Sequence, residues 1–143
     1  MDISTNIVIG DISDVAEIGE SSWPIENWRG FEIKGIDSTK IATLHAMLTG
    51  QTFDEAFGEY LLAYEATEEG PWVVKIPDEP MERLAVLEDD ALERVGEELA
   101  ATEEFESAGW PVEEVQIFLA ELTALAGVAI MQRKAMFLWT MSR

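Results

Sequence analysis

The chain has 143 residues, of which 48% are hydrophobic and 27% are charged. Such a chain is long enough for one domain with its own core, and its apolar fraction is typical of globular rather than disordered proteins. Twenty-nine acidic residues against nine basic ones give a net charge of −20, and there is no cysteine. Composition therefore excludes disulfides, thiol catalysis, zinc fingers and iron–sulfur clusters, and the negative charge disfavours direct binding to nucleic acids or membranes.

No segment is expected to cross a membrane or to direct export. The longest stretch without a charge, residues 41–53, is thirteen residues long, whereas a spanning helix needs about 20 apolar residues. The N-terminus lacks the basic region of a signal peptide. We therefore predict a cytoplasmic protein with a single globular domain over residues 1–143.

Residues 1–36 are the least regular part of the chain, and we expect them to pack on the domain as an irregular segment. Residues 6–9 and 31–34 are candidates for short strands. Between them, Trp23 and Trp28 stand in a segment rich in glycine, serine and acidic residues. The large apolar area of these rings favours a loop that they attach to the body of the protein, with an aromatic-lined ligand groove as the alternative.

Two helices are predicted next. Apolar residues recur at helical spacing between a start after Asp37 and a glycine stop at Gly50. A second helix begins at the capping box formed by Thr52 and Glu55, and it should end before Gly70. The short connection predicts an antiparallel helical hairpin.

The rest of the chain alternates strands and helices. Residues 72–76 are rich in β-formers and predict a strand that ends at Pro77. Helices are predicted over residues 80–87, from 88–90 to about 106, and from Pro111 through a long apolar stripe to Arg133 and Lys134. Residues 135–141 predict a strand that is apolar on both faces, so it should be central in a sheet or lie under a partner.

The predicted fold class is α+β and predominantly helical. About five helices should pack with a small antiparallel β-sheet formed by residues 31–34, 72–76 and 135–141. The long last helix should form the centre of the core, because its apolar stripe is the broadest in the chain.

The acidic residues are concentrated in one part of the sequence. Residues 78–114 hold fourteen acidic against two basic residues, a net charge of −12, whereas residues 115–143 have a net charge of +2. A solvated surface that aids solubility is one interpretation. The other is a surface that binds, and could neutralise, a basic protein, because complementary charge raises association rates. The candidate partner-binding residues are Glu88, Asp89, Asp90, Glu93, Glu97, Glu98, Glu103 and Glu104.

No catalytic motif is present, so we expect a protein that is not an enzyme and that needs no cofactor. The sequence has no glycine-rich phosphate loop and no nucleophile elbow. His45 is the only histidine, and it has no second metal ligand at helical spacing. The alternative is a small-molecule binder or enzyme with a pocket near Trp23, Trp28, His45 and Tyr60.

A homo-oligomeric module joined through the apolar C-terminal third is a further alternative. If the long helix covers only one face of the last strand, side chains on the other face are left for a second copy. Phe137 and Trp139 are the candidate residues of such a homodimer interface.

Overall fold

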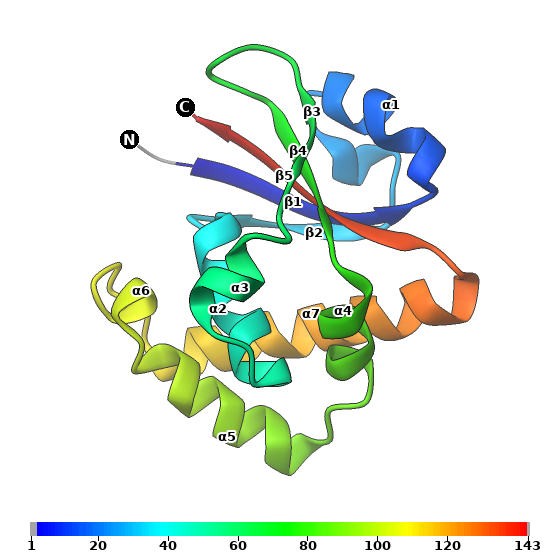
Figure 1. The fold of residues 1–143 in the computed structure, drawn as a ribbon. Helices are drawn as coiled ribbons and strands as arrows, with labels where there is room; N and C mark the ends of the chain where they lie inside the picture. Colours follow the sequence, from blue (N-terminus) through cyan, green and yellow to red (C-terminus); the bar gives the residue numbers. More distant parts are fainter. Residues whose placement is uncertain (1–2, 143) are drawn as a thin grey trace.

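The computed structural model describes residues 3–142 and has an α+β fold, as predicted (Figure 1). Within these residues, seven α-helices and two short 3₁₀ helices surround one antiparallel sheet with strand order β2-β1-β5-β4-β3. The strands are β1 (Ile3–Gly10), β2 (Gly30–Lys34), β3 (Leu62–Glu65), β4 (Trp72–Ile76) and β5 (Ala135–Ser142). The helices are η1 (Ile12–Asp14), α1 (Val15–Glu20), η2 (Pro24–Glu26), α2 (Ser38–Thr49), α3 (Phe53–Phe57), α4 (Asp78–Ala85), α5 (Asp89–Ala100), α6 (Glu103–Glu106) and α7 (Val112–Gln132).

The first and last strands lie side by side in the middle of the sheet. β1 and β5 pair over their whole length, from Ile3 opposite Ser142 to Gly10 opposite Ala135. On β5, Met136 and Leu138 belong to the larger core, whereas Phe137 and Trp139 belong to a smaller cluster on the opposite face. A strand buried on both faces needs apolar residues at successive positions, which explains the unbroken apolar run of β5.

Helices cover the two faces of the sheet unequally (Figure 1). The larger core lies between the sheet and the layer formed by α2, α4 and α7, and α5 packs on α7 as an outer helix. The other face is covered by the N-terminal region, where Ile18 of α1 and Trp28 pack against Val8 and Trp139. α7 has the predicted position at the centre of the core, with these side chains buried: Val115, Phe118, Leu119, Leu122, Leu125, Ala126 and Ala129.

The N-terminal segment is more regular than predicted. The candidate strands at residues 6–9 and 31–34 are present within β1 and β2, and β1 lies inside the sheet. Two polar side chains on β1 are fully buried, and both make hydrogen bonds. Thr5 donates its hydroxyl to the Ile36 carbonyl at 2.6 Å, and the side-chain oxygen of Asn6 accepts from the Ile25 amide at 3.2 Å. These bonds attach the chain on either side of β2 to β1.

Two predicted helices are shorter than expected. The capping box of Thr52 and Glu55 is present, with Thr52 N donating to Glu55 Oε1 at 3.0 Å, but α3 ends at Phe57 and the chain then forms β3. The next break follows α5. There, Thr102 donates its hydroxyl to the Leu99 carbonyl at 2.6 Å, so a local side-chain bond competes with continuation of the helix. These two breaks add α6 and β3, and the N-terminal segment adds α1 and β1, so the described residues form seven α-helices where about five were expected and a five-stranded sheet where three strands were expected.

Candidate partner-binding surfaces

The acidic residues singled out in the sequence lie on the outer side of α5 and on α6. α5 buries Val95 and Leu99 toward the core. At 100° per residue, Asp90, Glu93 and Glu97 lie on the opposite side of the same helix. Seven of the eight candidate side chains are exposed, and Glu104 is half-buried. α5 and α6, which carry seven of them, lie along one outer edge of the molecule, and Glu88 is the N-cap residue of α5 (Figure 1). We call these eight residues the acidic face.

The carboxylates of the acidic face have no cationic partner among the described residues. The ion pairs between charged side chains lie elsewhere: Lys75–Asp78, Arg83–Glu79 and Lys134–Asp11. Arg94 has the right spacing to pair with Asp90, but no ion pair joins them. The acidic face therefore presents uncompensated negative charge to the solvent.

Phe137 and Trp139, the candidate residues of a homodimer interface, have no exposed surface at all. The N-terminal region covers the face of β5 on which they lie, and Ile18, Trp28 and Tyr64 pack in the same cluster. The reason for assigning these two residues to an interface was that one face of the strand would be left uncovered. In the folded chain that face is covered, so the interface assignment of Phe137 and Trp139 is withdrawn.

His45 and Tyr60 come together, as the small-molecule hypothesis required, but they form a buried hydrogen-bond network. His45 is 1% exposed, and its Nδ1 lies 3.0 Å from the Tyr60 hydroxyl. Its Nε2 lies 2.6 Å from Gln51 Oε1, and the Gln51 amide donates to Glu59 Oε2 at 3.0 Å. Both ring nitrogens of His45 have a hydrogen-bond partner when Nε2 carries the proton and donates to Gln51 Oε1, and the Tyr60 hydroxyl donates to Nδ1.

This network ties α2 to the chain that follows α3, and its groups are occupied with one another. Burial, with a smaller contribution from the nearby Glu59 carboxylate, raises the pKa of the Tyr60 hydroxyl well above its ordinary value of 10.0. Trp28 lies on the opposite face of the sheet, and Trp23, also in the N-terminal region that covers that face, is 47% exposed. The four residues of the proposed pocket therefore do not surround one cavity.

A groove beside the helix layer was not predicted from the sequence. Two hollows follow one another between β2 and α7, and we call them together the β2–α7 groove. The larger, of about 500 Å³, lies beside Ile33 and Lys34 and is closed at one end by Trp110. The smaller, of about 260 Å³, lies beside Gly30 and Phe31, and Glu121 lines both. β2 and α7 thus contribute residues to both hollows, and Glu121 lies between them.

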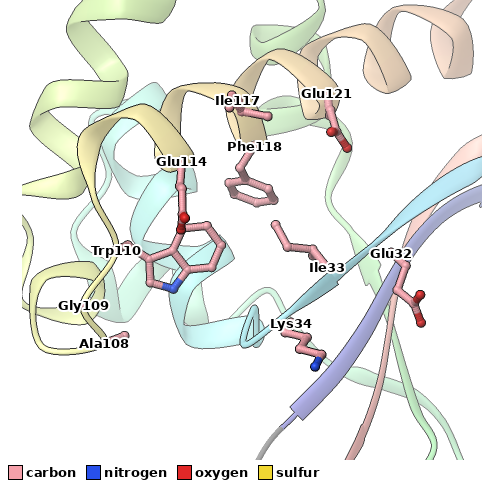
Figure 2. Close-up of a pocket in the computed structure, with 10 residues that line it drawn as sticks. All are labelled: Glu32, Ile33, Lys34, Ala108, Gly109, Trp110, Glu114, Ile117, Phe118 and Glu121. Carbon is pink, nitrogen blue, oxygen red and sulfur yellow. The ribbon is translucent and has the colours of Figure 1, made fainter.

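The larger hollow of the groove has an aromatic floor. Figure 2 shows Phe118 projecting from α7 toward Ile33 of β2, with the Trp110 ring beside it. The Phe118 ring contacts Phe31 at a centroid distance of 6.2 Å and Trp110 at 6.1 Å. Ile117 stands at the rim with 61% of its surface exposed. The sequence holds little indication of this groove. It shows an isoleucine, Ile117, outside the apolar stripe of α7, and a candidate strand at residues 31–34 whose neighbours in space could not be predicted.

α7 is the one helix of residues 3–142 with the length and apolar composition of a membrane-spanning segment. No spanning segment was expected from the sequence, because the longest stretch without a charge is residues 41–53 and Glu121 interrupts α7. In this fold the helix buries one side against the sheet and α5. Packing in the core accounts for the apolar residues of its buried side.

Within the described residues, no group of three or more histidine, aspartate or glutamate side chains is arranged to hold a metal ion. No protein-family model, curated protein or solved structure matches the chain. Its surfaces therefore carry the functional argument.

Proposed function

We propose that this protein is a non-enzymatic interaction module that binds a basic protein through the acidic face. The observation that carries the proposal is the set of eight carboxylates on one outer edge, exposed or half-buried and without cationic partners among the described residues. Like charges at i,i+4, such as Glu93 and Glu97, cost a helix a few tenths of a kcal/mol. A basic partner would relieve that repulsion and would be attracted at long range.

The test compares two triple charge reversals with the same change in net charge. One variant carries Glu93→Lys, Glu97→Lys and Glu104→Lys on the acidic face. The matched control reverses three glutamates of the N-terminal region, on the other side of the sheet: Glu17, Glu20 and Glu26, all exposed. Circular dichroism first establishes that both variants are folded.

The partner is captured from an extract of the native host at about 50 mM salt, purified, and its association rate is measured with each variant. We expect the acidic-face variant to associate at least about tenfold more slowly than the control, because steering depends on where the charge lies. Raising salt to about 500 mM should slow the unmodified protein in the same way by screening. Equal rates for the two variants, or the absence of a basic partner, would contradict the proposal.

A further inference from the structure

The outer edge of β2 has backbone groups without a strand partner. β2 pairs only with β1 among the described strands. The Gly35 amide donates to the Ile3 carbonyl and the Ile9 amide donates to the Arg29 carbonyl, both at 2.9 Å. In an antiparallel ladder the hydrogen-bonded pairs recur at every second residue. Arg29, Phe31, Ile33 and Gly35 therefore direct their backbone groups toward β1. Glu32 and Lys34 lie between those pairs, so their N–H and C=O groups point away from β1.

These free groups run alongside the β2–α7 groove. Ile33 faces the larger hollow and Phe31 the smaller one, whereas the intervening residue Glu32 offers its backbone to the open edge. An extended chain laid against this edge would project alternate side chains toward α7, about 7 Å apart. The two hollows follow one another along β2, so successive side chains on that face of the added chain would meet them in turn. Recognition by strand addition uses this combination of backbone bonds and side-chain pockets.

The groove also favours a particular chemistry in its occupant. Its larger hollow has an aromatic floor of Phe118 and Trp110, which suits a bulky apolar side chain. Carboxylates lie on both faces that an added strand would present. Glu114 and Glu121 line the hollow from α7, whereas the pleat of β2 directs the side chains of Glu32 and Lys34 away from α7 (Figure 2). None of the three carboxylates is in an ion pair within the described part of the chain. The intervening side chains of an added strand would lie on the same face as Glu32, so cationic residues that alternate with apolar ones would complement that carboxylate and the net charge of −20.

A second copy of the chain is a poorer occupant. Antiparallel pairing of two β2 strands centred on Glu32 would set two carboxylates directly opposite one another, which is destabilising, whereas pairing centred on Ile33 would set Glu32 opposite Lys34. In either register each copy carries a net charge of −20, so the two would repel. We propose that the β2–α7 groove binds an extended segment of a partner protein, with alternating apolar and cationic residues, as a sixth strand beside β2. This binding mode uses a surface separate from the acidic face and does not depend on it.

The test uses a blocked seven-residue peptide with lysine at its odd positions, phenylalanine at the centre and valine at the other two even positions. Its binding to the ¹⁵N-labelled full chain is followed by NMR. We expect shifts of the Glu32 and Lys34 amides and of the Trp110 indole. A peptide of the same composition with its apolar residues consecutive should bind several-fold more weakly, because it cannot alternate. Shifts confined to α5 and α6 would show charge adsorption only and would overturn the proposal.

Two variants at one position separate backbone bonding from charge. Glu32→Gln removes the carboxylate, and we expect about two- to threefold weaker binding. Glu32→Pro also removes the outward N–H, which β1 does not use, and should weaken binding by about a further tenfold. Equal affinities of the two variants would overturn strand addition.

A second pair of variants tests the groove wall without touching the sheet. Ile117→Asn at the rim of the larger hollow should weaken binding about fivefold or more, whereas Ile130→Asn on the same helix, outside the groove, should leave it unchanged. Sedimentation of the free protein completes the test. A dimer that the peptide dissociates would make a second copy the occupant and overturn the proposal, as would the absence of any binding at millimolar peptide.

Discussion

The two faces of the sheet are built by different means. One is covered by α2, α4 and α7, whose apolar residues recur at helical spacing, and α7 alone contributes seven buried residues. The other is covered by a six-residue helix and by a loop held by Trp28, and its cluster has six buried members. Both faces nevertheless bury side chains completely, including Leu122 on one and Trp139 on the other. A regular helix layer and an irregular segment can therefore exclude water from a sheet equally well.

The largest effect is expected in the helix layer. Leu122→Ala should lower the free energy of unfolding by about 2–5 kcal/mol, because the side chain is fully buried and the surrounding layer cannot collapse into the cavity. Urea denaturation measures the change. Ile130→Ala on the same helix is the control, since that side chain is 41% exposed and should cost under about 1 kcal/mol. A loss below about half a kcal/mol for Leu122→Ala would mean that α7 is peripheral.

The same kind of change on the other face should cost less. Ile18 is fully buried on α1, yet α1 has only six residues and can settle into the space left by a truncation. We expect Ile18→Ala to cost about 2 kcal/mol, at the low end of the range for such substitutions. A cost equal to that of Leu122→Ala, measured in the same urea series, would show that the irregular face is as rigid as the helix layer.

Two helical glycines sharpen the comparison. A Cβ on Gly19 of α1 would meet the ring of Tyr64, which is held between the helix and the sheet. A Cβ on Gly96 of α5 would meet Cγ of Gln116 at 2.6 Å, so the Gln116 side chain would have to change rotamer and lose its hydrogen bond to the Glu93 carbonyl. Alanine gains about 1 kcal/mol over glycine in a helix, which offsets part of either cost. Gly19→Ala should therefore destabilise by about 1–2 kcal/mol and Gly96→Ala by less, about 0–1 kcal/mol, as thermal unfolding can show.

The smallest effect concerns the buried network on the helix side. Tyr60→Phe removes the hydrogen bond to His45 and should cost about 1 kcal/mol at pH 7. The raised pKa of Tyr60 means that the folded state favours the neutral phenol. Its contribution is present below about pH 10 and is lost as the pH rises further. The unmodified protein should lose more stability than Tyr60→Phe in urea titrations above pH 10; parallel curves would contradict this assignment.

Sequence reasoning succeeded where one physical cause acts over a long segment. The stripe of α7, the Asp37 cap of α2 and the strand at 72–76 each follow from local periodicity or capping, and each is present. It failed where distant residues decide the structure. Residues 6–9 were a candidate strand, but the rest of β1 was not predicted, and the buried bonds of Thr5 and Asn6 to Ile36 and Ile25 are visible only in the fold. β3 forms because its backbone pairs with the edge of β4, which comes later in the chain.

The candidate surfaces divide in the same way. The acidic face could be predicted, because charge clustered in sequence on one helix is also clustered in space. The groove could not, because it needs β2 and α7 to lie side by side, and their residues are about 80–90 positions apart in the sequence. His45 and Tyr60 were correctly placed together, but their partner Gln51, which turns the pair into a closed network, was overlooked.

The pairing of β1 with β5 has a kinetic consequence. The residues that form the middle of the sheet are separated by almost the whole chain, since residues 3–10 pair with residues 135–142. During synthesis, the inner edge of β1 has no strand partner until residues 135–142 have left the ribosome. Non-local strand pairing of this kind slows folding, because loop-closure entropy is lost before the contacts form. The nascent chain therefore exposes an apolar strand for longer than a protein built from local hairpins, and it is in that interval that aggregation or chaperone binding competes with folding.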